Sequence, residues 1–145
     1  MSPLGGLEGS AFGHAMRDWP WLFPAVKALH LAGVGILFGS IAWLDLRLIG
    51  VLKSGSVKDQ ARRLLPWTLG SFLLIVPSGG AMFVAYASDF IASPVFILKM
   101  GLIFGAGINA ALFHTGTSSE RVAGAVSLLL WLSVITCGLV LAASE

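Results

Sequence analysis

The chain is dominated by four long runs of residues that carry no charge and are mostly apolar. These runs occupy residues 28–44, 64–88, 100–119 and 122–144. A helix needs roughly 20 such residues to cross the hydrocarbon core of a bilayer. The last three runs reach that length, and the first reaches it once Lys27, whose long side chain extends to the interface, is added. The pattern therefore predicts four membrane-spanning helices.

Prolines, glycines and charges set the bounds of these helices. We predict them at about 21–48, 64–87, 94–115 and 121–143, after a polar N-terminal segment over residues 1–20. Strands are not expected, because long apolar runs without alternation suit helices whose backbone groups are satisfied internally in lipid. The predicted fold is all-α, with one domain over residues 21–143 that forms an up-and-down four-helix transmembrane bundle.

Small and helix-breaking residues mark two places inside the predicted helices. The stretch Pro77-Ser78-Gly79-Gly80 removes a backbone hydrogen bond and a side-chain wall near the middle of the second helix, so we expect a kink or a close helix approach there. The third helix carries Gly101, Gly105 and Gly107. Helix packing in lipid depends on small residues, so these glycines predict tight packing.

The distribution of basic residues predicts the orientation of the chain. The first and third predicted loops and their edges carry most of the cations, whereas the loop over residues 88–93 carries none. By the positive-inside rule, the first and third loops face the cytoplasm, and both termini lie in the periplasm of a bacterial inner membrane. Residues 1–18 are glycine-rich and polar, so we expect no cleaved signal peptide. The basic residues concerned are Arg47, Lys53, Lys58, Arg62, Arg63 and Arg121.

Composition agrees with a membrane protein and excludes several functions. Of the 145 residues, 57% are hydrophobic and 11% are charged, against roughly 25% charged in soluble domains. Four spans leave too few residues for a soluble catalytic domain or a nucleic-acid module, and the net charge of +2 indicates no nucleic-acid partner. One cysteine excludes an internal disulfide. No motif for hydrolysis or phosphoryl transfer is present, so we do not expect an enzyme of those classes.

Four residues that could bind a metal fall in one layer of the predicted bundle. By helix rise, His30 lies about 7 Å from the centre of the first helix toward the outside. Met82, Met100 and Cys137, one from each remaining helix, fall within roughly 2 Å of that depth. Sulfur ligands together with imidazole suit copper, whereas imidazole alone or with methionine suits a b-type haem. The three sulfur residues are either ligands or ordinary packing residues.

His30 is the main candidate, because an imidazole within a span costs free energy unless it has a partner. It is either a ligand or proton-handling group, or one half of an interhelical hydrogen bond. Lys99 either extends to water or contacts an anionic group such as a haem propionate, or a quinone carbonyl. His114 lies roughly 20 Å in depth from His30, so it is either a solvated interfacial residue or the ligand of a second haem.

Asp45 and Arg47 place two opposite charges near the inner end of the first predicted helix. Residues two apart do not face each other on a helix. We therefore expect Asp45 to pair with Arg62 or Arg63, and Arg47 to bind lipid phosphate. Asn109 in the third helix is expected to form a helix–helix hydrogen bond.

Several short motifs resemble those of an uncharacterised bacterial family of four-helix inner-membrane proteins over roughly residues 20–115. More distantly, the segment Lys27-Ala-Leu-His30 together with the helix of Lys99 is similar to HemJ-type protoporphyrinogen oxidases, in which the histidine of the first helix is implicated in b-type haem binding. The stretch from Lys99 to Asn109 also resembles the copper-resistance protein D family. The resemblance implies a membrane role with a haem or copper centre at His30 and transfers no enzymatic activity. The shared motifs are Trp21-Leu-Phe-Pro24, Lys27-Ala-Leu-His30, Leu44-Asp45-Leu-Arg47-Leu-Ile-Gly50, Leu65-Pro66-Trp67, Phe96-Ile-Leu-Lys99 and Phe113-His114.

Three functional hypotheses follow from these residues. In the first, His30 ligates a b-type haem in the outer half of the bundle, with Met82 or Met100 as sixth ligand and Lys99 beside a propionate, and the protein has an electron-transfer or redox-accessory role. In the second, His30, Met82, Met100 and Cys137 bind or transport copper. In the third, the chain is a cofactor-free structural subunit. In each, lipid surrounds the chain, and a further membrane or periplasmic protein or a second copy is a candidate partner.

Overall fold

The computed structural model describes residues 2–53 and 55–144. Every regular element in these residues is an α-helix. Four of the helices are long and apolar enough to cross a membrane, which confirms the all-helical fold and the four predicted spans and indicates a multi-pass membrane protein. The four are α3 (Leu22–Ile49), α4 (Val57–Ala85), α6 (Pro94–His114) and α7 (Glu120–Ala143).

The predicted bounds hold for three of the four spans. The helices α3, α6 and α7 begin and end within one residue of the expected positions, whereas α4 begins at Val57 rather than near residue 64. The Ser56 hydroxyl accepts a hydrogen bond from the backbone N–H of Asp59 at 3.4 Å and caps this earlier start. The charged first turns of α4 therefore belong to the helix, and Pro66 and Pro77 both lie inside it.

The N-terminal segment, predicted only to be polar, forms two short helices, α1 (Pro3–Glu8) and α2 (Ala11–Asp18). Each begins at a serine, because the hydroxyls of Ser2 and Ser10 accept hydrogen bonds from backbone N–H groups three residues later. A third short helix, α5 (Ala87–Ala92), connects α4 to α6.

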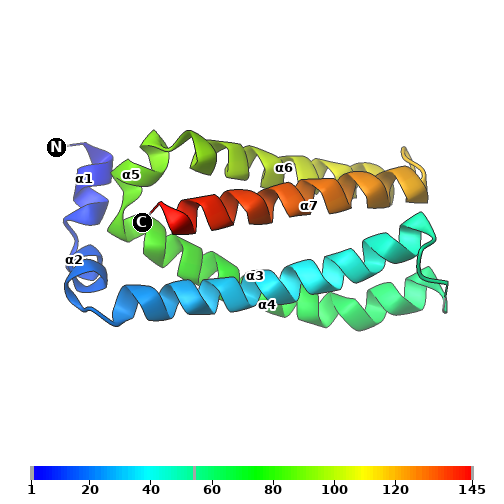
Figure 1. The fold of residues 1–145 in the computed structure, drawn as a ribbon, viewed down its shortest axis with the longest axis horizontal. Helices are drawn as coiled ribbons and strands as arrows, with labels where there is room; N and C mark the ends of the chain where they lie inside the picture. Colours follow the sequence, from blue (N-terminus) through cyan, green and yellow to red (C-terminus); the bar gives the residue numbers. More distant parts are fainter. Residues whose placement is uncertain (1, 54, 145) are drawn as a thin grey trace.

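The two N-terminal helices are fixed against the end of α4 and the start of α5. The Arg17 guanidinium donates to the backbone oxygens of Ala85 and Glu8, each at 2.7 Å. The Glu8 carboxylate accepts from the backbone N–H of Ser88 at 2.6 Å. Figure 1 shows α1 and α2 lying across the end of the long helices.

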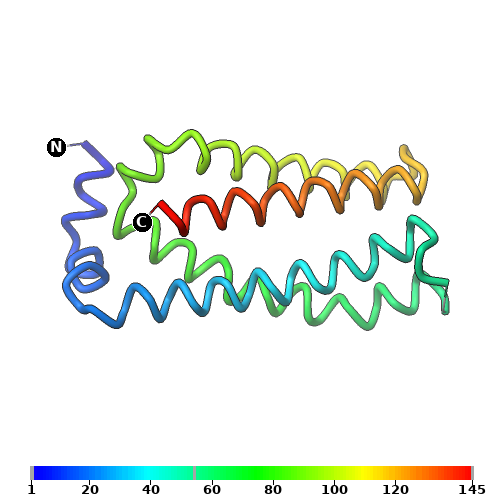
Figure 2. The backbone as a smooth tube through the Cα atoms, viewed as in Figure 1, coloured from blue at the N-terminus to red at the C-terminus, as the bar shows by residue number. Residues whose placement is uncertain are grey.

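The four long helices lie along one common direction, and consecutive ones run in opposite senses (Figures 1 and 2). Both chain termini are at the same end, which we call the terminal end; the connections near residues 50–56 and 115–119 form the opposite loop end. The helix α3 packs against α4 and α7, and α7 packs against α6. Near the terminal end, α4 and α6 meet through the rings of Phe83 and Phe96, whose centroids are 6.0 Å apart.

Two glycines let neighbouring helices approach closely. A Cβ atom on Gly33 of α3 would lie 2.9 Å from Ile75 Cγ1, and one on Gly124 of α7 would lie 2.9 Å from the Asp45 backbone oxygen. The expectation of tight packing at Gly101 and Gly107 is not met, because a Cβ there would have no neighbour within 4 Å in the described part of the chain. A Cβ on Gly105 would lie 3.8 Å from Leu130 Cδ2 of α7, which is an ordinary van der Waals distance.

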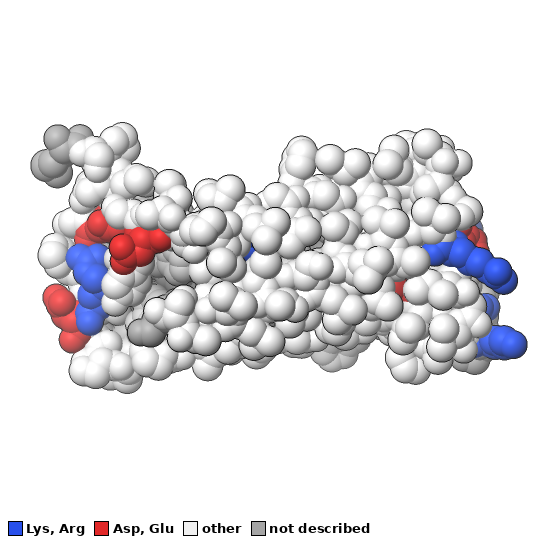
Figure 3. Space-filling model, turned by 45° about the horizontal axis from the view of Figure 1, so that its top comes forward, with Lys and Arg blue, Asp and Glu red and all other residues white. Residues whose placement is uncertain are grey.

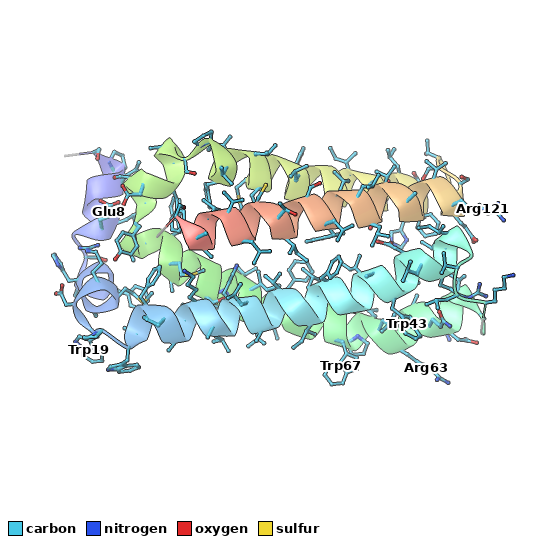
Figure 4. The ribbon with its side chains drawn as sticks, in the orientation of Figure 1. Glu8, Trp19, Trp43, Arg63, Trp67 and Arg121 are labelled. Carbon is cyan, nitrogen blue, oxygen red and sulfur yellow. The ribbon has the colours of Figure 1, made fainter. Side chains whose placement is uncertain are left out.

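Charged side chains gather at the two ends, and the middle of the molecule is almost free of them on the face drawn in Figure 3. Large apolar side chains are instead exposed along the long helices. Such a surface suits lipid, because acyl chains cover apolar side chains without a loss of free energy. The loop end carries Arg63 and Arg121, and the terminal end carries Glu8 and Trp19 (Figure 4).

Candidate functional site

His30 lies on α3 and faces α4 near the terminal half of the molecule. Its Nδ1 atom is 3.0 Å from the hydroxyl oxygen of Ser78 and 3.2 Å from the backbone oxygen of Ile75. The ring also packs on Gly79, where a Cβ atom would lie 3.1 Å from His30 Cε1. The close helix approach expected at Pro77–Gly80 is thus present, and it is the histidine ring that occupies the space left by the missing side chain.

The hydrogen-bond partners of His30 determine which ring nitrogen carries the proton. The Ser78 hydroxyl donates its own hydrogen within α4, to the backbone oxygens of Leu74 and Ile75. The Ile75 oxygen can only accept. We therefore assign the proton to Nδ1, which leaves Nε2 with its lone pair. Ligating histidines usually have this arrangement, with one nitrogen donating to a backbone carbonyl and the other free to bind a metal.

Two further polar side chains lie near the same layer. The Lys99 ammonium on α6 is close enough to act electrostatically on both His30 and Cys137. Its Nζ atom is 3.6 Å from the position a Cβ would take on Gly138 of α7. Cys137 is buried and free. His30, Ser78, Lys99 and Cys137 form what we call the histidine cluster, which joins all four long helices.

The two candidate methionines occupy different positions relative to this cluster. Met82 is half-buried and lies four residues after Ser78, so it is on the same side of α4, one turn toward the terminal end. Met100 is 42% exposed. Because it follows Lys99 directly, its side chain leaves α6 about 100° away from that of the lysine. The structure brings Met82 and Cys137 to the cluster side and leaves Met100 on the outer surface.

A pocket of about 700 Å³ opens at the terminal end, and it is lined by residues other than those of the histidine cluster. Ligand pockets usually have volumes of roughly 300–1,000 Å³. Lys27 lines this pocket and lies three residues before His30, about one turn of α3. The pocket combines aromatic rings with a few polar groups, and its other lining residues are Phe23, Pro24, Tyr86, Asp89, Phe90, Ser93, Leu141, Ala142 and Ser144.

The remaining histidines do not join the cluster. His114 is exposed at the last residue of α6, at the loop end, and His14 is exposed on α2. In the described residues, three or more His, Cys, Asp or Glu side chains do not gather at any point as a metal-binding group. A centre at His30 would therefore need a cofactor or methionine sulfur to complete its ligand set.

The predicted contacts at the loop end are only partly found. Asn109 donates from Nδ2 to the Ala123 backbone oxygen at 3.0 Å, which confirms a hydrogen bond between α6 and α7. Arg47 donates to the backbone oxygens of Leu52 and Gly55. The expected pairing of Asp45 with Arg62 or Arg63 is not present: both arginines are exposed, and Asp45 Oδ2 is buried without a hydrogen-bond partner among the described residues.

The hydrogen bonds of His30 to Ser78 and Ile75 of α4 confirm the interhelical hydrogen bond that was one of its two expected roles, and a ligand role stays a prediction. Sequence reasoning did not identify these two partners. Ser78 is an ordinary small residue in a Pro-Ser-Gly-Gly stretch, and its contact with His30 depends on how α3 and α4 rotate against each other. Comparison of the chain with protein-family models, curated proteins and solved structures gives no match. The functional argument therefore depends on the geometry of the chain itself.

Proposed function

We propose that the chain is a bacterial inner-membrane protein whose four long helices form an up-and-down bundle with both termini in the periplasm. Six of its nine lysines and arginines lie at the loop end, and Arg63 and Arg121 are among those labelled there in Figure 4. The positive-inside rule favours a cytoplasmic position for such an end. The terminal end, with Glu8 and Trp19, is then periplasmic.

Within this bundle, His30 binds a b-type haem in the periplasmic half, and the protein has an electron-transfer or redox-accessory role. The observation that carries this proposal is the fixed imidazole: Ser78 and Ile75 engage Nδ1, so Nε2 is available as a ligand. The pocket of about 700 Å³ at the terminal end supports it, because it offers aromatic walls one helical turn from His30.

The residues around His30 would divide the binding of a haem between them. His30 Nε2 would be one ligand of the iron, and Met82, which shares a face of α4 with Ser78, is the candidate for a second. Lys99 beside His30 and Lys27 in the pocket would neutralise the propionates. When bound, a b-type haem supplies a one-electron couple whose potential depends on its axial ligands and the local dielectric.

Copper is the alternative cofactor for the same histidine, with Met82, Met100 and Cys137 as its sulfur ligands. The Lys99 ammonium acts on both His30 and Cys137, and it would repel a cuprous ion between them. Met100 would have to turn inward from an exposed position. The third hypothesis, a cofactor-free subunit of a larger complex, is supported by the open, glycine-containing surface of α6.

The absorption spectrum and metal content of the purified protein distinguish these three hypotheses. Haem binding predicts a Soret band in the wild-type protein that is lost in His30→Ala and retained in His14→Ala, a control at an exposed histidine. A colourless preparation with stoichiometric copper would replace the haem proposal by the copper one. A preparation that has neither a Soret band nor copper, and that co-purifies with other subunits, would support the cofactor-free structural role instead.

A further inference from the structure

Asp45 is a buried acidic side chain within a membrane-spanning helix. It is 4% exposed, and among the described residues it is the only buried member of the acidic and basic side chains. It lies on α3 four residues before Ile49, the last residue of the helix, which is about 6 Å of helix rise. A buried carboxyl group needs either a cationic partner or a bound proton.

The helix α7 encloses the Asp45 carboxyl group. The Ser127 hydroxyl of α7 is its hydrogen-bonding neighbour. At Gly124, one turn away on the same helix, the backbones approach so closely that a Cβ would lie 2.9 Å from the Asp45 backbone oxygen. The second carboxyl oxygen, Oδ2, is buried and has no hydrogen-bond partner in the described residues. The carboxyl group therefore has one polar neighbour, the Ser127 hydroxyl, and its Oδ2 atom faces no hydrogen-bonding group of the described residues.

No cation of the described chain compensates a charge at this site. Arg47, on the same helix, donates to the backbone oxygens of Leu52 and Gly55. The polar neighbour of the Asp45 carboxyl group is the Ser127 hydroxyl rather than a charged side chain. The titratable side chains on the neighbouring helices are exposed at the loop end: Lys58, Asp59, Arg62 and Arg63 on α4, His114 on α6, and Glu120 and Arg121 on α7.

An ionised carboxylate without a cation loses much more solvation free energy on burial than the neutral acid does. We infer that Asp45 and Ser127 form a proton-binding site between α3 and α7, in which the Asp45 carboxyl group holds a proton at a pH at which the exposed carboxyl groups of the chain are ionised. Fifteen residues, or about 22 Å of helix rise, separate it from His30, so the inference does not depend on the proposed haem.

Infrared spectroscopy of the full chain in micelles of a detergent without ester or carboxyl groups tests this inference. A protonated carboxylic acid has a C=O stretching band that is resolved from the amide bands and from ionised carboxylates. We expect this band in the wild-type protein at about pH 6, where exposed carboxyl groups are ionised, its loss in the isosteric variant Asp45→Asn, and its retention in Asp59→Asn, the control at an exposed aspartate. In Ser127→Ala the band should remain and shift, because its hydrogen bond is removed. Absence of the band in the wild-type protein, or its survival in Asp45→Asn, would overturn the inference.

A chemical test needs no variant that could misfold. A lipophilic carbodiimide adds the O–H of a protonated carboxyl group across its C=N bond, and the acyl group then migrates to nitrogen, so the whole reagent is retained as a stable adduct. We expect mass spectrometry to locate this adduct on the peptide that contains Asp45 in the wild-type protein. Labelling confined to other carboxyl groups, or labelling of Asp45 that sodium chloride suppresses at constant pH, would contradict a proton site.

Discussion

The chemistry of His30 depends on two neighbours that only the folded chain brings to it. Ser78 and Ile75 both present oxygen lone pairs to Nδ1, and Gly79 gives the ring room to lie against α4. Ser78 follows Ile75 by three residues, so its hydroxyl and the Ile75 backbone oxygen lie on one face of α4. Both oxygens can therefore accept from the same ring nitrogen. This arrangement fixes the orientation of the imidazole.

Replacement of Ser78 tests whether this orientation matters for ligand binding. Outer partners of a ligating histidine typically contribute about 10–100-fold to metal affinity. In Ser78→Ala the Ile75 oxygen still accepts from Nδ1, so we expect haem affinity to fall by about tenfold, at the lower end of that range. Titration with haem, followed by the Soret band, measures the change.

The matched control is Ser71→Ala. Ser71 is also a buried serine of α4, but its hydroxyl donates to the Thr68 backbone oxygen at 2.6 Å. Haem affinity should be unchanged in this variant. Equal losses in both serine variants would indicate a general disturbance of α4 rather than a specific role of Ser78.

At this scale, depth along a helix could be predicted from the sequence, but rotation about its axis could not. Helix rise placed Cys137 near the level of His30, and the Lys99 ammonium lies close enough to both residues to act on them electrostatically. The same arithmetic gave Met100 the same depth, yet its side chain points outward. The rotation of a helix that is apolar all round depends on packing, which hydropathy alone does not encode.

At the scale of elements, glycines determine which helices come close. Gly33 brings α3 against α4, and Gly124 brings α7 against α3. The four spans could be predicted, together with the first and last residues of α3, α6 and α7, because membrane crossing requires long uncharged runs. The start of α4 was missed because its first turns are charged, and the caps of α1 and α2 were missed because single serines are weak signals.

The contact between α3 and α7 predicts a measurable effect of one methyl group. In Gly124→Ala the new Cβ would lie 2.9 Å from both the Asp45 backbone oxygen and Leu48 Cβ, so the helices must separate. We expect the free energy of unfolding to fall by about 1–3 kcal/mol, as measured by unfolding in mixed micelles.

Gly107→Ala is the matched control for this prediction. A Cβ at Gly107 meets no atom within 4 Å in the described residues, and alanine favours a helix over glycine by about 1 kcal/mol. The control should be unchanged or more stable. A loss of stability in Gly107→Ala but not in Gly124→Ala would mean that α6 packs where the account leaves it open.

At the scale of the whole molecule, the two ends differ in charge. Figures 3 and 4 show basic side chains at the loop end and a mixture of acidic and basic ones at the terminal end. The sequence predicts an orientation because the distribution of lysine and arginine is a property of loops and not of helix packing. A membrane orientation itself requires a measurement in the cell.

Two single-cysteine variants test this orientation, each with Cys137→Ser in the background. His14→Cys places a thiol on the exposed surface of α2, and Lys58→Cys places one at the exposed start of α4. With a membrane-impermeant maleimide, the first should react in intact spheroplasts and the second only after the membrane is permeabilised. The reverse pattern would invert the proposed topology and place His30 in the cytoplasmic half.

The central claim is that the Nε2 atom of His30 binds a haem, and titration of haem into the protein in lipid nanodiscs tests it most directly. The account predicts a Soret change that saturates at one haem per chain in the wild-type protein, with saturable binding lost in His30→Ala and kept in His14→Ala. If the wild-type protein shows no saturable binding, or if His30→Ala binds as tightly as the wild-type protein, the claim is contradicted.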